Sequence, residues 1–231
     1  MMSIRVCVVG AEGRMGRLAC EWIADAPDLE LVARLGPRDS IEDQAGLVDV
    51  AVDLTRPDAA VAVVEACVRL RIAVVSGTSG WTESRIEVLR HATRHEPRCR
   101  VLIVPNFSVG AVLLARFVRE AAPFFASCEI VETHHREKVD APSGAAAWLA
   151  EEIRAGLGNE APVPIHSLRM AGALAEHEVR FGQGAESLRL VHSSTDRHSF
   201  AAGLLTAVRA VGSLDGIHVG LGPLLDRLRP H

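Results

Sequence analysis

The residues best suited to chemistry lie in one short stretch, THHREKVDAPSG at positions 133–144. It carries the imidazoles of His134 and His135, the ammonium of Lys138 and the hydroxyl of Ser143. Imidazole exchanges protons near neutral pH, and an ammonium can orient or polarise an anionic substrate. The stretch predicts a site for proton transfer on a small anionic molecule. Taken alone, it fits a solvated surface loop equally well.

The flanking elements favour the first interpretation. The segment 128–132 predicts a strand that ends at the first imidazole, and Ser143 is a suitable cap for the apolar helix that follows it. A loop between a strand and a helix is a common place for binding and catalytic groups. The start of a helix also offers free N–H groups and a partial positive charge, both of which suit an anionic ligand.

The chain begins with a dinucleotide-binding pattern. An apolar strand at 4–9 leads into GAEGRMG at 10–16, and apolar residues at helical spacing follow. Gly10 permits the tight turn, Gly13 lets the backbone approach a pyrophosphate, and Gly16 lets the helix lie close to the strand. A glycine-rich turn with no ligand is the alternative. The turn residues predicted to contact the cofactor are Gly10, Ala11, Glu12, Gly13, Arg14, Met15 and Gly16.

Strands and helices alternate through the rest of the first half. Strands are expected at 29–33, 48–54, 72–75 and 101–104, and helices are expected to begin after the caps Thr55 and Thr82, with Asp58 completing a capping box at the first. This alternation predicts a Rossmann-like, doubly wound parallel sheet of the α/β class, which binds ligands at the carboxyl ends of its strands.

The second half has another pattern. A helix at 109–121, strands at 165–170, 176–181 and 187–191, and a last helix at about 196–211 predict a smaller α+β domain with a mostly antiparallel sheet. We expect a dinucleotide-binding domain at 1–106, a substrate-binding and oligomerisation domain at 107–202, and a C-terminal region at 203–231. One face of the second sheet is expected to contact another subunit.

Composition excludes several classes of function. The chain has 231 residues, 48% of them hydrophobic, and a net charge of −4, so no basic surface for nucleic acid or an anionic membrane is expected. No apolar run is long enough to span a membrane, and the start lacks the layout of a signal peptide. The 5 cysteines are scattered, which predicts reduced thiols in a cytoplasmic protein and no metal site.

With these motifs in view, the chain resembles the 4-hydroxy-tetrahydrodipicolinate reductase (dihydrodipicolinate reductase) family over nearly its full length. The matching segments are VVGAEGRMGR near the start, DLTRPDA at 53–59, SGTSGW at 76–81, PNFSVGA at 105–111, HHREKVDAPSG at 134–144 and RMAGALAEHEVRFG at 169–182. The resemblance implies a Rossmann domain, a second domain that forms a homotetramer, and reduction of a cyclic dicarboxylate by NADH or NADPH, with loss of water, in lysine and diaminopimelate biosynthesis.

The resemblance also assigns residue roles. It implies that His134 is the proton donor or acceptor, that Lys138 is the second catalytic group, and that the substrate is bound by His135, Ser143, Gly144 and the residue at position 145. A further set matches the segments of the family that contact the cofactor, and it consists of Gly77, Thr78, Ser79, Pro105, Asn106 and Phe107.

Three departures distinguish this chain from the family pattern. Ala145 replaces a threonine whose hydroxyl would donate to a substrate carboxylate, and the segment before Ile165 is short. The position of the usual ribose-binding acid is occupied by Gly36, between Arg34 and Arg38. Because the acid is missing and a guanidinium can pair with a 2′-phosphate, we expect NADPH to be accepted at least as well as NADH.

Three functions therefore stay open at this point. The first is the lysine-pathway reductase. The second is a paralogue that reduces a different cyclic imine or enamine acid, which Ala145 and the short segment before Ile165 keep open, although we favour the first. The third is a cofactor-binding protein without turnover, which the presence of both His134 and Lys138 argues against.

Overall fold

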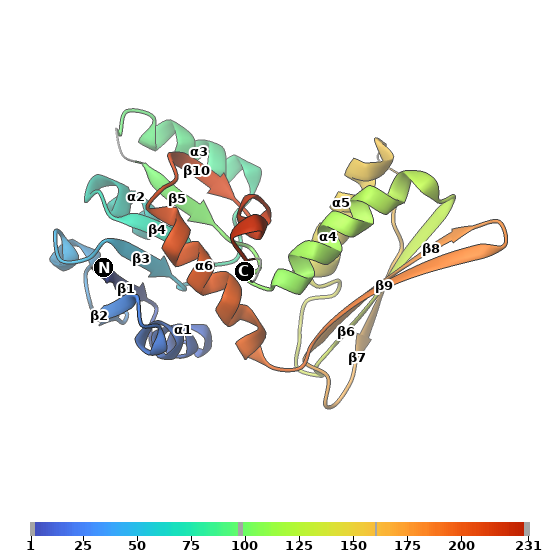
Figure 1. The fold of residues 1–231 in the computed structure, drawn as a ribbon, viewed down its shortest axis with the longest axis horizontal. Coiled ribbons are helices and arrows are strands. Elements are labelled where there is room, and N and C mark those ends of the chain that lie inside the picture. The colour runs from blue at the N-terminus through green and yellow to red at the C-terminus, as the bar shows by residue number, and fades with distance from the viewer. Residues whose placement is uncertain (1–2, 97–98, 160, 229–231) are drawn as a thin grey trace. The chain divides into compact units, whose positions relative to one another are not determined.

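The computed structural model describes residues 3–96, 99–159 and 161–228, and it divides into two compact units (Figure 1). The first unit contains the chain up to Phe107 and from Phe200 onward, and the second contains Ser108–Ser199. The change of unit after Phe107 lies beside the expected boundary at 106, and the Phe107 ring is buried against Gly77 of the first unit. The expected C-terminal region extends to 231, and its last residues, 229–231, lie outside the described part.

The first unit is built on a six-stranded parallel sheet in the order β10-β5-β4-β3-β1-β2. Its strands are β1 (Ile4–Val9), β2 (Leu29–Leu35), β3 (Val50–Asp53), β4 (Ala73–Ser76), β5 (Arg100–Ile103) and β10 (Gly216–Val219). Every residue of the central strands β3 and β4 is buried, as expected for strands covered on both faces. The doubly wound sheet predicted from the sequence is confirmed, but strand β10 was not predicted.

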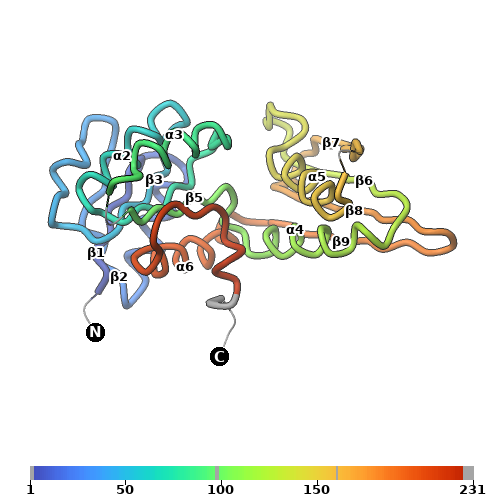
Figure 2. Tube along the Cα trace, turned by 90° about the horizontal axis from the view of Figure 1, so that it is seen from above, coloured from blue at the N-terminus to red at the C-terminus, as the bar shows by residue number. Residues whose placement is uncertain are grey.

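Four helices cover the two faces of this sheet. They are α1 (Arg14–Asp25), α2 (Ala60–Arg69), α3 (Glu83–Thr93) and α6 (Ala201–Val211). Helices α1 and α6 contact each other, and so do α2 and α3. The α2–α3 pair lies on the opposite side of the sheet from α6 (Figures 1 and 2). The sheet and the helices therefore form the three layers of a Rossmann-like domain.

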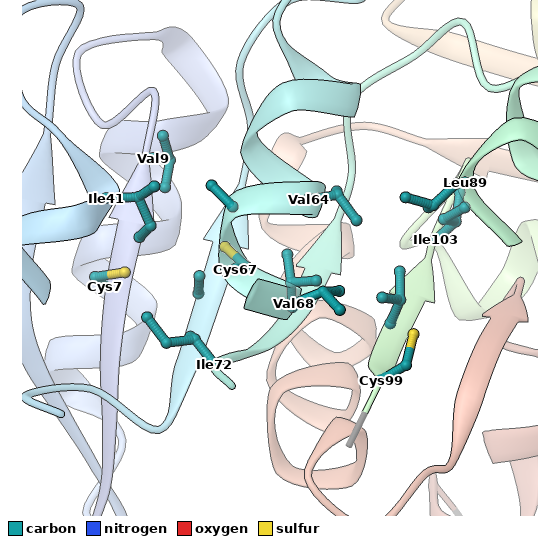
Figure 3. Packing of buried hydrophobic residues seen from close by; sticks show 14 of the residues in the cluster. Cys7, Val9, Ile41, Val64, Cys67, Val68, Ile72, Leu89, Cys99 and Ile103 are labelled. Atoms are coloured by element: carbon teal, nitrogen blue, oxygen red, sulfur yellow. The ribbon is translucent and has the colours of Figure 1, made fainter. Parts of the chain in front are cut away.

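The core on the α2–α3 side joins the sheet to these helices (Figure 3). Cys7 and Cys67 lie within it beside Val64 and Ile72, and all are buried. Burial raises the pKa of the Cys7 thiol to about 12, so this thiol stays protonated at neutral pH. These cysteines fill space as small apolar residues, in keeping with the free thiols of all the cysteines.

The predicted start of α2 is wrong. Thr55 does not cap that helix, which begins at Ala60 after Ala59 and has no side-chain cap. The Thr55 hydroxyl instead donates to Asp53 Oδ1 at 2.6 Å, because the carboxylate at the end of β3 is a closer and stronger acceptor. The predicted cap of α3 is correct, since Thr82 accepts a hydrogen bond from Arg85 N.

The second unit packs two helices on one face of a four-stranded sheet in the order β7-β6-β8-β9. The elements are α4 (Val109–Ala121), β6 (Ser127–His134), α5 (Gly144–Leu157), β7 (Ile165–Arg169), β8 (Ala175–Gln183) and β9 (Glu186–Ser194). Strand β6 pairs parallel with β7 and antiparallel with β8, and β8 pairs antiparallel with β9. The prediction of a mostly antiparallel α+β domain is therefore confirmed.

Short 3-10 helices complete the described chain. They are η1 (Ile41–Gln44), η2 (Ala122–Phe124), η3 (Arg197–Phe200) and η4 (Gly222–Leu228). The last helix was predicted from about Asp196, but its first part is the 3-10 turn η3 and α6 begins at Ala201. Within the described ranges, no helix combines the length and the apolar character needed to cross a bilayer.

Candidate active site

The glycine turn after β1 has the geometry of a dinucleotide-binding turn. Gly10 has φ +81°, which side chains rarely tolerate. A Cβ on Gly16 would lie 2.1 Å from the Gly10 carbonyl oxygen, so α1 approaches the turn too closely for any other residue. Gly13 precedes the first residue of α1. The turn therefore leaves the amino end of this helix able to bind a phosphate through its N–H groups.

A cavity of about 520 Å³ adjoins this turn at the carboxyl ends of β1, β2 and β3. Three of the predicted cofactor residues, Gly10, Glu12 and Gly13, line it. Arg34 and Arg38 are exposed and are not among its lining residues. The full lining is Val9, Gly10, Glu12, Gly13, Gly36, Pro37, Leu54, Thr55, Arg56 and Ala59.

The loops after β4 and β5 form a neighbouring part of the same rim. The Phe107 ring packs on Gly77, where a Cβ would lie 2.3 Å from it. Thr78 is buried, and its Oγ1 has no hydrogen-bond partner among the described residues. Buried hydroxyls are normally paired, so this one is suited to a ligand. Ser79 and Pro105 are exposed, whereas Asn106 is half-buried.

In the second unit, His134 is the last residue of β6, and it is buried. Its Nδ1 is hydrogen-bonded to Oε2 of Glu132, which is fully buried. A carboxylate can only accept, so Nδ1 carries the proton and Nε2 is the free atom of the neutral ring. No group of the described chain bonds to Nε2. Burial lowers the pKa of His134 below its usual value, while Glu132 acts in the opposite direction.

The Glu132 carboxylate is the centre of a buried network. Its Oε1 accepts from Arg169 Nη2 at 2.9 Å and from the backbone N of Ser143 at 3.3 Å. Burial raises the pKa of Glu132, but Arg169, Ser167 and His134 outweigh that effect and hold the pKa at about 2. The group is therefore an anion, and it fixes both the ring of His134 and the start of α5.

A second buried histidine lies beside the first. The His177 ring meets the His134 ring edge to face, with centroids 5.2 Å apart. His177 Nε2 lies 3.3 Å from Ser143 Oγ, which caps α5 by accepting from Ala146 N. Burial lowers the pKa of His177 to about 4, so this ring is neutral at physiological pH. His177 therefore packs against His134 without competing for its proton.

The loop between His134 and α5 carries the remaining candidates. Lys138 Nζ lies 2.8 Å from each oxygen of Asp140, and its side chain is 21% exposed. The charge of Lys138 contributes to lowering the pKa of His134, so the two groups act on each other electrostatically. His135 Nδ1 lies 3.1 Å from Glu137 Oε2.

The start of α5 is open to a ligand. A Cβ on Gly144 would meet no atom within 4 Å, and Ala145 is half-buried beside it. The backbone of Gly144 contributes to lowering the pKa of Asp140, which places its N–H near that carboxylate. The structure thus brings Lys138 and the amino end of α5 to one anionic group. These are the two positive features predicted to bind a substrate.

Three buried or half-buried residues of this site were not predicted from the sequence, namely Glu132, Arg169 and His177. Glu132 could have been found, because a residue two positions before His134 on a strand shares its face. His177 and Arg169 belong to other strands. Their pairing with Glu132 and His134 in the sheet depends on a register that single-strand patterns do not reveal.

Comparison with known proteins agrees with this geometry. The sequence profile described as "Dihydrodipicolinate reductase, N-terminus" matches residues 4–107, and the profile for the C-terminus of the same enzyme matches residues 110–222. The chain belongs to the dihydrodipicolinate reductase family. The 4-hydroxy-tetrahydrodipicolinate reductase of Nocardia farcinica is 41% identical over 97% of this chain and 100% of its own length. That of Streptomyces avermitilis is 40% identical over 98% and 99%.

Solved structures extend the likeness to three dimensions. A dipicolinate-bound dihydrodipicolinate reductase from Paenisporosarcina sp. superposes with a TM-score of 0.85 at 28% identity, covering 96% of this chain and all of that one. A probable dehydrogenase from Thermotoga maritima superposes with a TM-score of 0.64 at 13% identity, over 97% of this chain and 93% of that one, and shows the fold alone. Membership of the dihydrodipicolinate reductase family therefore rests on sequence and structure together.

Proposed function

We propose that this protein is an NAD(P)H-dependent oxidoreductase that reduces 4-hydroxy-tetrahydrodipicolinate to tetrahydrodipicolinate in lysine and diaminopimelate biosynthesis. The observation that carries the proposal is the His134–Glu132 pair at the end of β6, which bonds to the N-cap of α5 and is influenced by the charge of Lys138, in a chain whose first unit holds a dinucleotide-binding turn. The relatives with this activity in their names match nearly the whole chain. This supports the reductase over a paralogue or a protein without turnover.

The residues present suit a nicotinamide cofactor. The glycine turn and the helix behind it would bind the pyrophosphate, and the buried, unpaired Thr78 hydroxyl would bind another polar group of the cofactor. When bound, the reduced cofactor supplies the hydride of the reaction. The protein has to provide everything else, namely substrate binding and a proton at the right atom.

The second unit would provide these. Lys138 and the N–H groups at Gly144 and Ala145 would hold a substrate carboxylate in the place where Asp140 now lies. His135 would contact the same substrate. His134 Nε2, which is free, would move the proton, while Glu132 holds Nδ1 and stabilises the charged ring.

We also propose that the protein is a cytoplasmic homotetramer. Support comes from the sheet face of the second unit that α4 and α5 leave uncovered, on which Val191 is 54% and Leu168 is 45% exposed. Apolar side chains on an open sheet face favour a protein partner. Sedimentation velocity would test the tetramer, and a monomer at micromolar concentration would contradict it.

The activity itself is tested with freshly generated 4-hydroxy-tetrahydrodipicolinate. We expect stoichiometric oxidation of NADH or NADPH and formation of tetrahydrodipicolinate, identified by mass spectrometry. A protein that binds the cofactor but oxidises it only with another cyclic imine acid would be the paralogue. A protein that binds the cofactor and turns over neither substrate would lack the enzymatic function.

A further inference from the structure

The end of β2 lacks the acid that normally selects the cofactor. In dinucleotide-binding folds, a carboxylate at this position accepts hydrogen bonds from the adenosine ribose, and it repels a 2′-phosphate. Here the position is held by Gly36, which lines the cavity beside the glycine turn. Glycine has no side chain to perform either task, so another group has to supply the charge or the selection is lost.

The structure places another carboxylate at this point. A Cβ built on Gly36 would lie only 2.9 Å from Oε1 of Glu12, the third residue of the glycine turn. The Glu12 carboxylate therefore fills the space into which a side chain at position 36 would project. Glu12 lines the same cavity as Gly36, and it is exposed.

The Glu12 carboxylate is also free to accept hydrogen bonds. Among the residues that the structure describes, no group donates to its side chain. Its backbone oxygen accepts from Arg17 Nε at 3.1 Å, which ties this part of the turn to α1. The other nearby acid, Asp39, is already engaged, because its Oδ2 accepts from the backbone N of Gly36 at 2.8 Å. Of the two acids, Glu12 is thus the one available to a ligand.

In the described chain, the cations near this cavity are not paired with the Glu12 carboxylate, since Arg17 bonds to the backbone oxygen of Glu12 and not to its side chain. Arg34 and Arg38 are exposed, and they are not among the residues that line the cavity. The arginine that does line the cavity, Arg56, is paired with Asp58 at 2.9 Å. A 2′-phosphate in this cavity would therefore meet the Glu12 carboxylate, and the arginine among the lining residues is already paired with Asp58.

We propose that Glu12 takes the place of the missing strand-end acid, accepts hydrogen bonds from the adenosine ribose hydroxyls and selects NADH over NADPH. This inference rests on the proposed function, since it concerns the cofactor of that reaction. It reverses the preference expected from Gly36, Arg34 and Arg38 in the sequence. The reason is that the carboxylate comes from the glycine turn and not from β2.

Titration calorimetry with NADH and with NADPH tests this directly. We expect the wild type to bind NADH at least about tenfold more tightly than NADPH, as a charge-assisted hydrogen bond and a like-charge contact would require. Glu12→Gln should weaken NADH binding, strengthen NADPH binding and bring the two dissociation constants to within about threefold. Glu30→Gln serves as the control, because Glu30 is an exposed glutamate of β2 that lies outside this cavity.

A second variant removes the carboxylate of the glycine turn and introduces one at the end of β2. Gly36 has no positive φ, and the atom that crowds its Cβ is the end of the Glu12 side chain, so Glu12→Ala/Gly36→Asp is sterically acceptable. This double variant should regain the preference for NADH that Glu12→Gln loses. An unchanged NADH-to-NADPH ratio in Glu12→Gln, or a wild type that prefers NADPH, would overturn the inference. Failure of the wild type to bind either cofactor would instead contradict the proposed function.

Discussion

Lys138 Nζ lies 2.8 Å from both carboxylate oxygens of Asp140, two residues along the same loop. The pairing lowers the pKa of Asp140, and the nearby Gly144 backbone contributes in the same direction. The Asp140 carboxylate thus binds to the Lys138 ammonium and to the start of α5, which are the two groups that we propose bind the substrate. Substrate binding then requires an exchange of one carboxylate for another.

Asp140→Asn should make this exchange easier. Without its charge, residue 140 competes less well for Lys138, and we expect the KM for the substrate to fall, by no more than about fivefold because the pair is partly exposed. Initial-rate measurements at fixed cofactor would show this. Asp196→Asn, which removes another exposed carboxylate of the second unit, is the control. A raised KM in Asp140→Asn would mean that Asp140 positions Lys138 and does not compete with the substrate.

The pH dependence of turnover should follow His134. Its pKa lies below the usual value of about 6.5, chiefly because of burial. Donation needs the protonated ring, so kcat/KM should be highest on the acidic side and fall as the pH rises through the pKa. A pH–rate profile with NADH checks this. A profile that rises towards alkaline pH would indicate that His134 acts as the proton acceptor.

Glu132→Gln should separate positioning from catalysis. Glu132 raises the pKa of His134 and forces the proton onto Nδ1, so its loss should lower kcat by about tenfold or more and move the falling limb of the profile to lower pH. Glu129→Gln is the matched control, because Glu129 is on the same strand as Glu132 but forms an exposed pair with His166 of β7. If kcat fell but the falling limb of the pH–rate profile stayed at the same pH, Glu132 would have only a structural role and would not set the pKa of His134.

Ala145→Thr should improve substrate binding. A hydroxyl at the start of α5 would donate to the substrate carboxylate, and we expect the KM for 4-hydroxy-tetrahydrodipicolinate to fall about tenfold with the cofactor KM unchanged. Ala145→Val has the same shape without the hydroxyl, and it should not reproduce the effect. If Thr and Val behaved alike, no substrate carboxylate would lie at this position, which would favour the paralogue.

The sequence predicted the architecture better than the connections within it. The glycine turn, the parallel strands and the Ser143 cap follow from local patterns and are confirmed in the structure. The Thr55 cap was wrong because Asp53, two residues earlier, bonds to its hydroxyl. Strand β10 was missed because it is short, only half-buried for most of its length, and pairs with a strand more than a hundred residues away.

In the candidate site, too, local patterns were predicted from the sequence and contacts between distant segments were not. His134, Lys138 and Ser143 stand in one motif, and the sequence alone brings them together. Arg169 holds the loop through the carbonyl oxygen of Asp140 and the carboxylate of Glu132, and only the β6–β7 register reveals these contacts. Likewise, Glu12 reaches the end of β2 because the turn and the strand are adjacent in space, which spacing in the sequence does not show.

The most direct test of the account is the turnover of His134→Gln and Lys138→Ala with freshly generated 4-hydroxy-tetrahydrodipicolinate. We predict that each variant lowers kcat about a hundredfold or more, since each loses a group that acts on the reacting substrate. The dissociation constant of the cofactor should stay the same, because both residues belong to the second unit and lie outside the glycine turn and its cavity. Turnover close to that of the wild type in both variants would contradict the central claim that these two residues carry the chemistry.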